Sequence, residues 1–172
     1  ARAWWGAFIR RVLAALDHDA PWRPLLDELW DHFAEPSAWR LYPDVEPALD
    51  ALSRRPVALA VVSNWDRRLP PLLAGLGLAG RFRTVTVSAV EGVEKPAPEI
   101  FRRTLERLGT TPARAVHVGD SIRDDYRGAE ASGLMAVLVD RHGRHRGEVA
   151  NRVDALDELP ALLDAAAGGR ST

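Results

Sequence analysis

Three polar residues stand where a ligand site is expected in this sequence. Ser63, Lys95 and Asp120 each come after an apolar segment with the composition of a strand, Lys95 after a short intervening loop. The spacing is 32 residues from Ser63 to Lys95 and 25 from Lys95 to Asp120, each about one strand–helix unit. Ligands bind at the carboxyl ends of the strands in open parallel sheets. We therefore expect a hydroxyl, an ammonium group and a carboxylate to converge on one edge of a sheet.

This combination of groups suits phosphoryl transfer. A serine hydroxyl and nearby backbone N–H groups can hold phosphoryl oxygens, and a lysine places a compact charge against them. Carboxylates hold Mg2+, which prefers oxygen ligands and keeps several waters. The reaction then needs a nucleophile and a general acid.

Lys95 is the only lysine, since 22 of the 23 basic residues are arginine. One lysine in a chain with this bias towards arginine indicates that arginine would not serve at position 95. Chance survival is the alternative interpretation.

From residue 56 onward the pattern alternates between strands and helices. The run Val57–Val62 is almost continuously apolar, which is typical of a strand buried on both faces. Alternating strands and helices predict a parallel sheet with helices on both faces. The other expected strands are 84–87, 115–118 and 134–139, and the expected helices are 69–76, 97–108, 122–132 and 154–166.

The first 40 residues predict two helices, and a short helix follows at 45–53. Five of the six tryptophans fall in the first 39 residues. Helical spacing gives the first helix one apolar face made of Trp5, Phe8, Ile9, Val12, Leu13 and Leu16. Pro21 suits the start of the second helix, whose inner side carries Leu25, Leu26, Leu29, Trp30 and Phe33. We expect most of these side chains to pack between the two helices and the core, with Trp39 or Trp65 lining a site. The alternatives are that the helices form a cap that closes over a ligand, or a surface that binds a second copy or another partner.

Composition excludes several classes of protein. The 172 residues carry a net charge of -1, so no general attraction to nucleic acid or to a membrane surface follows. There is no cysteine, which excludes disulfides and zinc–thiolate sites. No apolar run reaches the roughly 18–20 residues of a membrane span, and no signal peptide is visible. We expect a cytoplasmic protein, of open oligomeric state.

Three parts of this sequence resemble the second, third and fourth motifs of the haloacid dehalogenase-like (HAD) hydrolase superfamily. They are Ser63, the triplet Glu94-Lys95-Pro96, and Gly119-Asp120-Ser121 with Asp125. The resemblance covers roughly residues 40–141. The strings Ser63-Asn64-Trp65-Asp66 and Asp125–Ala129, with the tryptophan-rich helices, most resemble the subgroup of haloacid dehalogenase-like hydrolase domain-containing protein 3.

The resemblance implies an α/β fold, a doubly wound Rossmann-like parallel sheet with a small helical cap. The cap would be residues 1–42, the core residues 43–166, and a flexible tail residues 167–172.

The resemblance also implies roles for these residues. Ser63 would hydrogen-bond the transferring phosphoryl group, with Asn64 beside it as a second substrate-binding residue. Lys95 would neutralise charge between nucleophile and phosphoryl group. The cofactor would be Mg2+, with Asp120 reaching the metal directly or through water and Asp125 supporting it.

The next carboxylate, Asp124, has two interpretations. It can belong to a capping box with Ser121 as N-cap, which we favour. The alternative is that Asp124, instead of Asp125, is the second carboxylate of the motif. We expect His117 to be an ordinary sheet residue and the basic stretch 141–146 to be a solvated loop.

The superfamily's first motif is absent from this chain. That motif is an aspartate after a buried strand, usually with a second aspartate two positions on; the one similar pair, Asp17 and Asp19, falls in a predicted helix–helix loop. In the family the cap follows this motif, so we expect that an N-terminal segment is missing. Its strand would be central, between those ending at Ser63 and Asp120, and we expect the chain alone to be poorly stable and inactive.

The resulting function is a Mg2+-dependent phosphatase of small phosphorylated metabolites that works through an aspartyl-phosphate intermediate. One alternative is a non-catalytic relative that binds a phosphorylated ligand or a partner protein. A further alternative is a metal-free haloacid dehalogenase, against which the Asp120/Asp125 pair argues.

Overall fold

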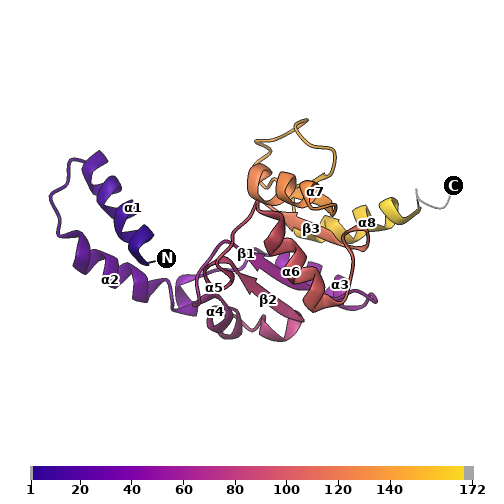
Figure 1. The fold of residues 1–172 in the computed structure, drawn as a ribbon, viewed down its shortest axis with the longest axis horizontal. Coiled ribbons are helices and arrows are strands. Elements are labelled where there is room, and N and C mark those ends of the chain that lie inside the picture. The colour runs from indigo at the N-terminus through magenta and orange to yellow at the C-terminus, as the bar shows by residue number, and fades with distance from the viewer. Residues whose placement is uncertain (1, 169–172) are drawn as a thin grey trace.

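A helical hairpin and an α/β body make up the computed structural model, which describes residues 2–168 (Figure 1). The hairpin consists of α1 (Arg2–Ala15) and α2 (Trp22–His32), and Pro21 is the N-cap of α2, as its position predicts. A short 3-10 turn at Pro36–Ala38 leads to α3 (Val45–Ser53) in the body.

The predicted apolar face of α1 is only partly buried. Gly6 and Ile9 are buried, and a Cβ at Gly6 would come within 3.0 Å of the Trp22 ring on α2. Phe8, Val12 and Leu16 from the same predicted face are 45%, 39% and 68% exposed. The helix is where the spacing predicts it, but a pair of helices meets along one narrow seam, so part of this apolar face stays in solvent.

The strands form two separate parallel sheets. In the first, β1 (Ala60–Ser63) pairs with β2 (Thr84–Val87). The second has the order β3 (Val116–Gly119), β4 (Met135–Val139), β5 (Arg152–Val153). Every pair is parallel, which confirms the α/β class. The two-residue β5 was not predicted.

The helices of the body fall close to their predicted places. The segment 122–132 is a π-helical turn, Ile122–Arg127, followed by α7, and the last helix begins only at Leu159 after a 3-10 turn. A short helix, α5, was not predicted. The helices are α4 (Leu69–Gly75), α5 (Ser88–Glu91), α6 (Pro98–Leu108), α7 (Gly128–Ala131) and α8 (Leu159–Gly168).

Helices cover both faces of the second sheet, and β4 shows why. Ala136 and Leu138 belong to a core cluster with residues of α6 and α7, whereas Val137 and Val139 belong to a cluster with residues of α3 and α8. Because side chains alternate across a strand, one apolar strand supplies both clusters. This arrangement confirms the doubly wound layering.

The edges of β1 and β3 stay open. Within residues 2–168 each of these strands has one hydrogen-bonded neighbour, and the two are not paired with each other. All of β1 is only partly buried and Val116 of β3 is 37% exposed, whereas Val137 and Leu138 of β4 are 0% exposed. The predicted burial of the run from Val57 on both faces is therefore wrong: the strand begins only at Ala60 and lacks a neighbour on one side.

At the C-terminus, α8 continues to Gly168, and the rest of the predicted tail lies outside the described residues. Among the helices of residues 2–168, none combines the length and the apolar character needed to cross a membrane.

Candidate functional site

Lys95 lies where the two sheets approach each other. Its Nζ donates a hydrogen bond to the carbonyl of Val62 in β1 at 2.9 Å and another to Asp125 Oδ1, beyond the end of β3, at 2.5 Å. The Lys95 side chain is 11% exposed. The ammonium group therefore bridges the ends of β1 and β3, although its partners there are Val62 and Asp125 and not Ser63 and Asp120, with which the spacing predicts that it converges.

Asn64 holds the backbone of Lys95. Its Nδ2 donates to the Lys95 carbonyl at 2.9 Å, and its Oδ1 accepts from the Lys95 N–H at 2.8 Å. Both ends of the Asn64 amide are thus engaged by Lys95. This contact favours a positioning role for Asn64 over the direct phosphoryl contact that the resemblance implies.

Asp125 is the centre of a buried polar cluster. Its Oδ1 accepts from Lys95 Nζ and lies 2.8 Å from His117 Nε2, while its Oδ2 accepts from the Ser121 N–H at 3.0 Å. Burial opposes ionisation of this carboxyl, but hydrogen bonds from His117 and Lys95 and the charge of Lys95 hold its pKa well below the ordinary value. Asp125 is therefore a carboxylate whose oxygens are occupied by protein donors.

Gly119 makes room for this carboxylate. A Cβ at position 119 would stand 2.1 Å from Asp125 Cγ, far inside contact distance. The glycine before Asp120 therefore lets the turn after β3 lie against Asp125, a packing requirement that the motif alone does not explain.

Ser121 is the N-cap of the π-helical turn, and its Oγ accepts from the Asp124 N–H at 3.0 Å. This is half of the predicted capping box. The other half, a carboxylate that accepts from the Ser121 N–H, comes from Asp125, one residue later than predicted. A π-helical turn widens the helix by one residue per turn, which brings Asp125 back over the N-cap.

Ser63 and Asp120 end β1 and β3. Ser63 is half-buried and pairs in register with Val87, and Asp120 is exposed just beyond Gly119. No hydrogen-bond partner of either side chain is found in the described part of the chain. Within residues 2–168 no group of three or more His, Asp or Glu residues is arranged to hold a metal ion.

His117 lies in β3, as expected of an ordinary sheet residue, but it also contacts the polar cluster, which was not predicted. Besides its contact with Asp125, its ring lies edge-on to Phe101 with the centroids 5.1 Å apart. Its position on β3, two residues before Gly119, places it on the same face as Gly119. That alternation is the signal in the sequence that could have assigned it to the site.

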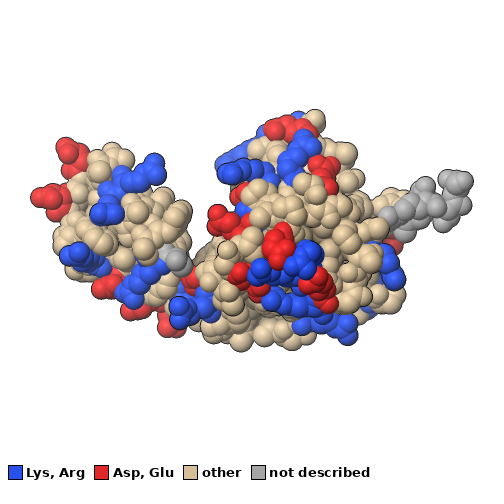
Figure 2. All heavy atoms as spheres, in the orientation of Figure 1, with Lys and Arg blue, Asp and Glu red and all other residues tan. Residues whose placement is uncertain are grey.

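A cleft of about 780 Å³ separates the hairpin from the body next to this cluster. Trp4 and Trp5 of α1 form one wall, and Asn64, Trp65 and Glu94 are among the residues of the other. Figure 2 shows the hairpin standing apart from the body with a recess between them, and basic and acidic residues interspersed over this face.

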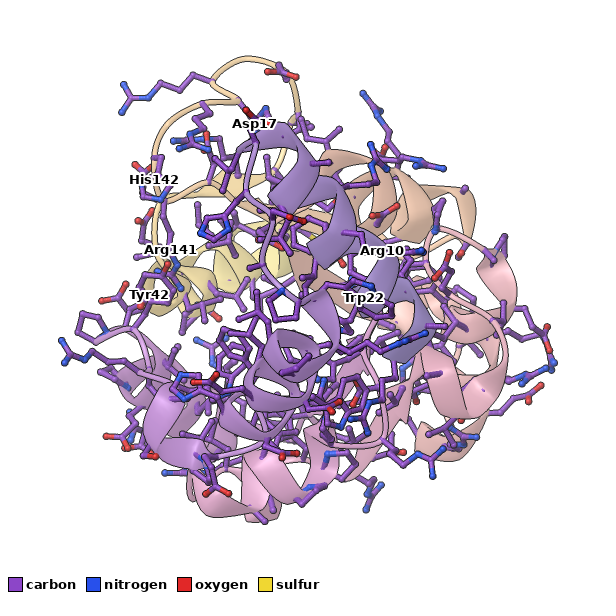
Figure 3. All side chains as sticks on the ribbon, turned by 90° about the vertical axis from the view of Figure 1, so that its left-hand side faces the viewer. Arg10, Asp17, Trp22, Tyr42, Arg141 and His142 are labelled. Atoms are coloured by element: carbon purple, nitrogen blue, oxygen red, sulfur yellow. The ribbon has the colours of Figure 1, made fainter. Side chains whose placement is uncertain are left out.

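The basic stretch after β4 is a loop organised by Asp140. This carboxylate accepts from the N–H groups of Arg144 and His145 at 2.9 Å each and from Arg152 Nε at 2.8 Å. Figure 3 shows Arg141 beside Tyr42, and the guanidinium lies 4.1 Å from the centre of that ring. These contacts give the loop a structural role.

Comparisons with known proteins agree with this geometry. The model of a protein family described as haloacid dehalogenase-like hydrolase matches residues 1–133 of this chain. Haloacid dehalogenase-like hydrolase domain-containing protein 3 of Mus musculus is 40% identical over 141 residues, which are 81% of this chain and 56% of that protein. A phosphoserine phosphatase of Thermus thermophilus is 39% identical over 145 residues, 81% of this chain and 57% of that protein. The chain therefore spans little more than half the length of these curated relatives.

A solved structure supports the same relationship. The crystal structure of a HAD phosphatase from Thermococcus onnurineus matches with a TM-score of 0.72 and 32% identity, covering 88% of this chain and 68% of that one. The structure of L-2-haloacid dehalogenase from Xanthobacter autotrophicus matches with a TM-score of 0.73 and 24% identity, and the match covers 88% of this chain and 71% of that one. At this identity the match shows a similarity of fold alone.

Proposed function

This chain belongs to the haloacid dehalogenase-like hydrolase family, and from that premise we propose that it carries most of the active site of a Mg2+-dependent phosphatase of small phosphorylated metabolites. The observation that carries the proposal is the Lys95 ammonium, held between the ends of β1 and β3 by Val62 and Asp125. Relatives named phosphoserine phosphatase and glyceraldehyde 3-phosphate phosphatase support this class of reaction.

Lys95 has one donor left for a substrate. An ammonium group has three N–H donors, and the Val62 carbonyl and Asp125 take two of them. The third is available to a phosphoryl oxygen, and the charge stabilises negative charge on that group. We assign Ser63 to a neighbouring phosphoryl oxygen, because its hydroxyl ends β1 one residue after Val62.

Asp120 is the carboxylate that fits Mg2+. It is exposed at the end of β3, whereas each oxygen of Asp125 already accepts from a protein donor. Mg2+ commonly binds through one or two carboxylates, substrate oxygens and waters, so Asp120 with Asp124 nearby is a sufficient protein contribution. When bound there, the ion would neutralise charge on the phosphoryl oxygens. Asp125 supports the site by fixing Lys95 and the turn that bears Asp120.

The nucleophile in this proposal is an aspartate on a strand that pairs with the open edges of β1 and β3. Its carboxylate oxygen attacks phosphorus, the bond from phosphorus to the ester oxygen breaks, and the leaving alcohol takes up a proton. Water then hydrolyses the aspartyl phosphate. Without that strand the chain should be inactive, and the partial exposure of β1 and Val116 supports the inference that a neighbouring strand belongs there.

The test is phosphate release from a panel of phosphomonoesters, with Mg2+ and with EDTA, by a protein that contains the nucleophile strand beside this chain; without that strand no release is expected. We expect turnover only with Mg2+, loss of that turnover in Asp120→Asn, and a loss of about 100-fold in Lys95→Met. Asp157→Asn, at an exposed carboxylate outside the site, is the matched control and should leave turnover unchanged. Turnover that survives both EDTA and Asp120→Asn would contradict the proposal and favour the dehalogenase, which chloride release from 2-chloropropionate would detect. Phosphate binding without any turnover would favour the non-catalytic alternative.

A further inference from the structure

A small apolar pocket lies between the hairpin and the body. Its volume is about 90 Å³, and it opens beside the larger cleft. Aromatic side chains dominate its walls, and both parts of the molecule contribute. The residues that matter here are Trp5, Leu29, Trp30, Trp39, Trp65 and Arg68.

The one charged group in the wall is already neutralised. Arg68 Nε and Nη2 donate to the two oxygens of Asp66 at 2.9 and 2.8 Å. The guanidinium also donates to the Trp30 carbonyl at 2.6 Å and lies 3.5 Å from the centre of the Trp30 ring. It thereby fastens α2 to the body, and it leaves the pocket without a free charge to meet a charged ligand.

The pocket and the cleft beside the candidate site share two wall residues. Trp5 and Trp65 line both spaces. The cleft is also lined by Asn64 and Glu94, which directly follow Ser63 and directly precede Lys95. The tryptophan-lined pocket therefore lies on the side of the candidate site towards which the rest of a molecule with its phosphoryl group at Lys95 would extend.

We propose that the substrate is a phosphomonoester whose far end is a short, uncharged alkyl group, and that this group binds in the tryptophan-lined pocket. This inference rests on the proposed phosphatase function. The size of the pocket sets the size of the group, since an apolar cavity of about 150 Å³ accepts benzene and this one is smaller. A charged end would lose its hydration without gaining a partner there.

Isothermal titration of the protein in Mg2+ with inorganic phosphate, ethyl phosphate, butyl phosphate and phosphoserine tests the inference. Each buried methylene tightens binding about fourfold, so butyl phosphate should bind about 16-fold more tightly than ethyl phosphate. Phosphoserine, with its charged far end, should bind more weakly than butyl phosphate.

Leu29→Trp should fill the pocket and remove the advantage of butyl phosphate while leaving the affinity for inorganic phosphate unchanged. Val12→Trp is the matched control, because Val12 is 39% exposed on α1 and is not part of the pocket wall. If thermal melting shows that Leu29→Trp does not fold, Trp39→Ala replaces it, and this enlarged pocket should shift the preference towards hexyl phosphate.

The outcomes separate the two proposals. If inorganic phosphate and all esters bind equally, the inference on the substrate fails and the phosphatase proposal stands. If neither phosphate nor any ester binds, both fail together. If the advantage of butyl phosphate persists in Leu29→Trp, the alkyl group binds elsewhere and the assignment to this pocket is wrong.

Discussion

Asn64 and Lys95 are joined by a two-point contact in which one side-chain amide satisfies both the N–H and the C=O of a residue 31 positions away. The contact connects the end of β1 to the loop that carries the only lysine of the chain. It leaves the Lys95 side chain free to reach Val62 and Asp125.

Replacing Asn64 should loosen this connection. Asn64→Leu keeps the approximate size of the side chain and removes both hydrogen bonds, so we expect the free energy of unfolding to fall by about 1–2 kcal/mol. Asn64→Asp retains the acceptor and turns the donor into an oxygen facing the Lys95 carbonyl, so it should also destabilise. Urea denaturation measures both variants, and unchanged midpoints would show that the contact contributes nothing.

The buried pair of Lys95 and Asp125 should be strongly coupled. Lys95→Met leaves the Asp125 carboxylate buried without its ammonium partner and should lower the free energy of unfolding by about 3 kcal/mol. In a Lys95→Met/Asp125→Asn double variant the second change should cost much less than in the parent chain. A double-mutant cycle by urea denaturation gives the coupling energy, and additivity of the two single changes would refute the pairing.

Gly119 and Gly80 provide a matched pair of glycines. Gly119→Ala puts a methyl group into Asp125 and should destabilise by about 1–3 kcal/mol. Gly80→Ala meets no atom within 4 Å and should change stability by no more than about 0.5 kcal/mol. Thermal melting of both variants checks this contrast; equal effects would mean that the turn can move away from Asp125.

Stability should fall in acid through carboxyls such as Asp140. Burial opposes its ionisation, but the Arg152 ion pair and the N–H groups of His145 and Arg144 lower its pKa to about 2. In the unfolded chain the pKa of Asp140 is about 3.9, so between about pH 4 and pH 2 the unfolded chain binds more protons than the folded one. The stability contributed by Asp140 is therefore present above about pH 4 and lost towards pH 2.

The pH dependence of the unfolding free energy between pH 6 and 2 measures this contribution of Asp140. Asp140→Asn should flatten the slope between about pH 4 and 2, whereas the exposed Asp157→Asn should not. An unchanged slope in Asp140→Asn would assign the acid loss to other carboxyls.

Local pattern predicted much of the fold and part of the candidate site. Helical spacing and apolar runs predicted the order of the elements. The rule on parallel strand ends predicted that Ser63, Lys95 and Asp120 converge, whereas the contact in the structure is between Lys95 and Asp125. These features depend on neighbours in the sequence or on a general rule of parallel sheets.

The remaining features depend on neighbours in space. Whether the run from Val57 is buried depends on which strands flank it, and that information is absent from the run itself. A π-helical turn of six residues looks like an ordinary helix in the sequence. The sequence therefore predicted that Asp124 accepts from the N-cap Ser121 N–H, whereas Asp125 does so in the structure. His117 is a usual strand residue until Asp125 is found beside it.

The single lysine also gives the chain a built-in chemical reporter. Lys95 carries the only side-chain amine, and that amine is mostly enclosed and ion-paired. An acylating reagent can modify it only when the contact with Asp125 opens and the amine loses its proton. The rate of acylation, read as one mass increment on one peptide, therefore reports how often the centre of the site opens in the native protein.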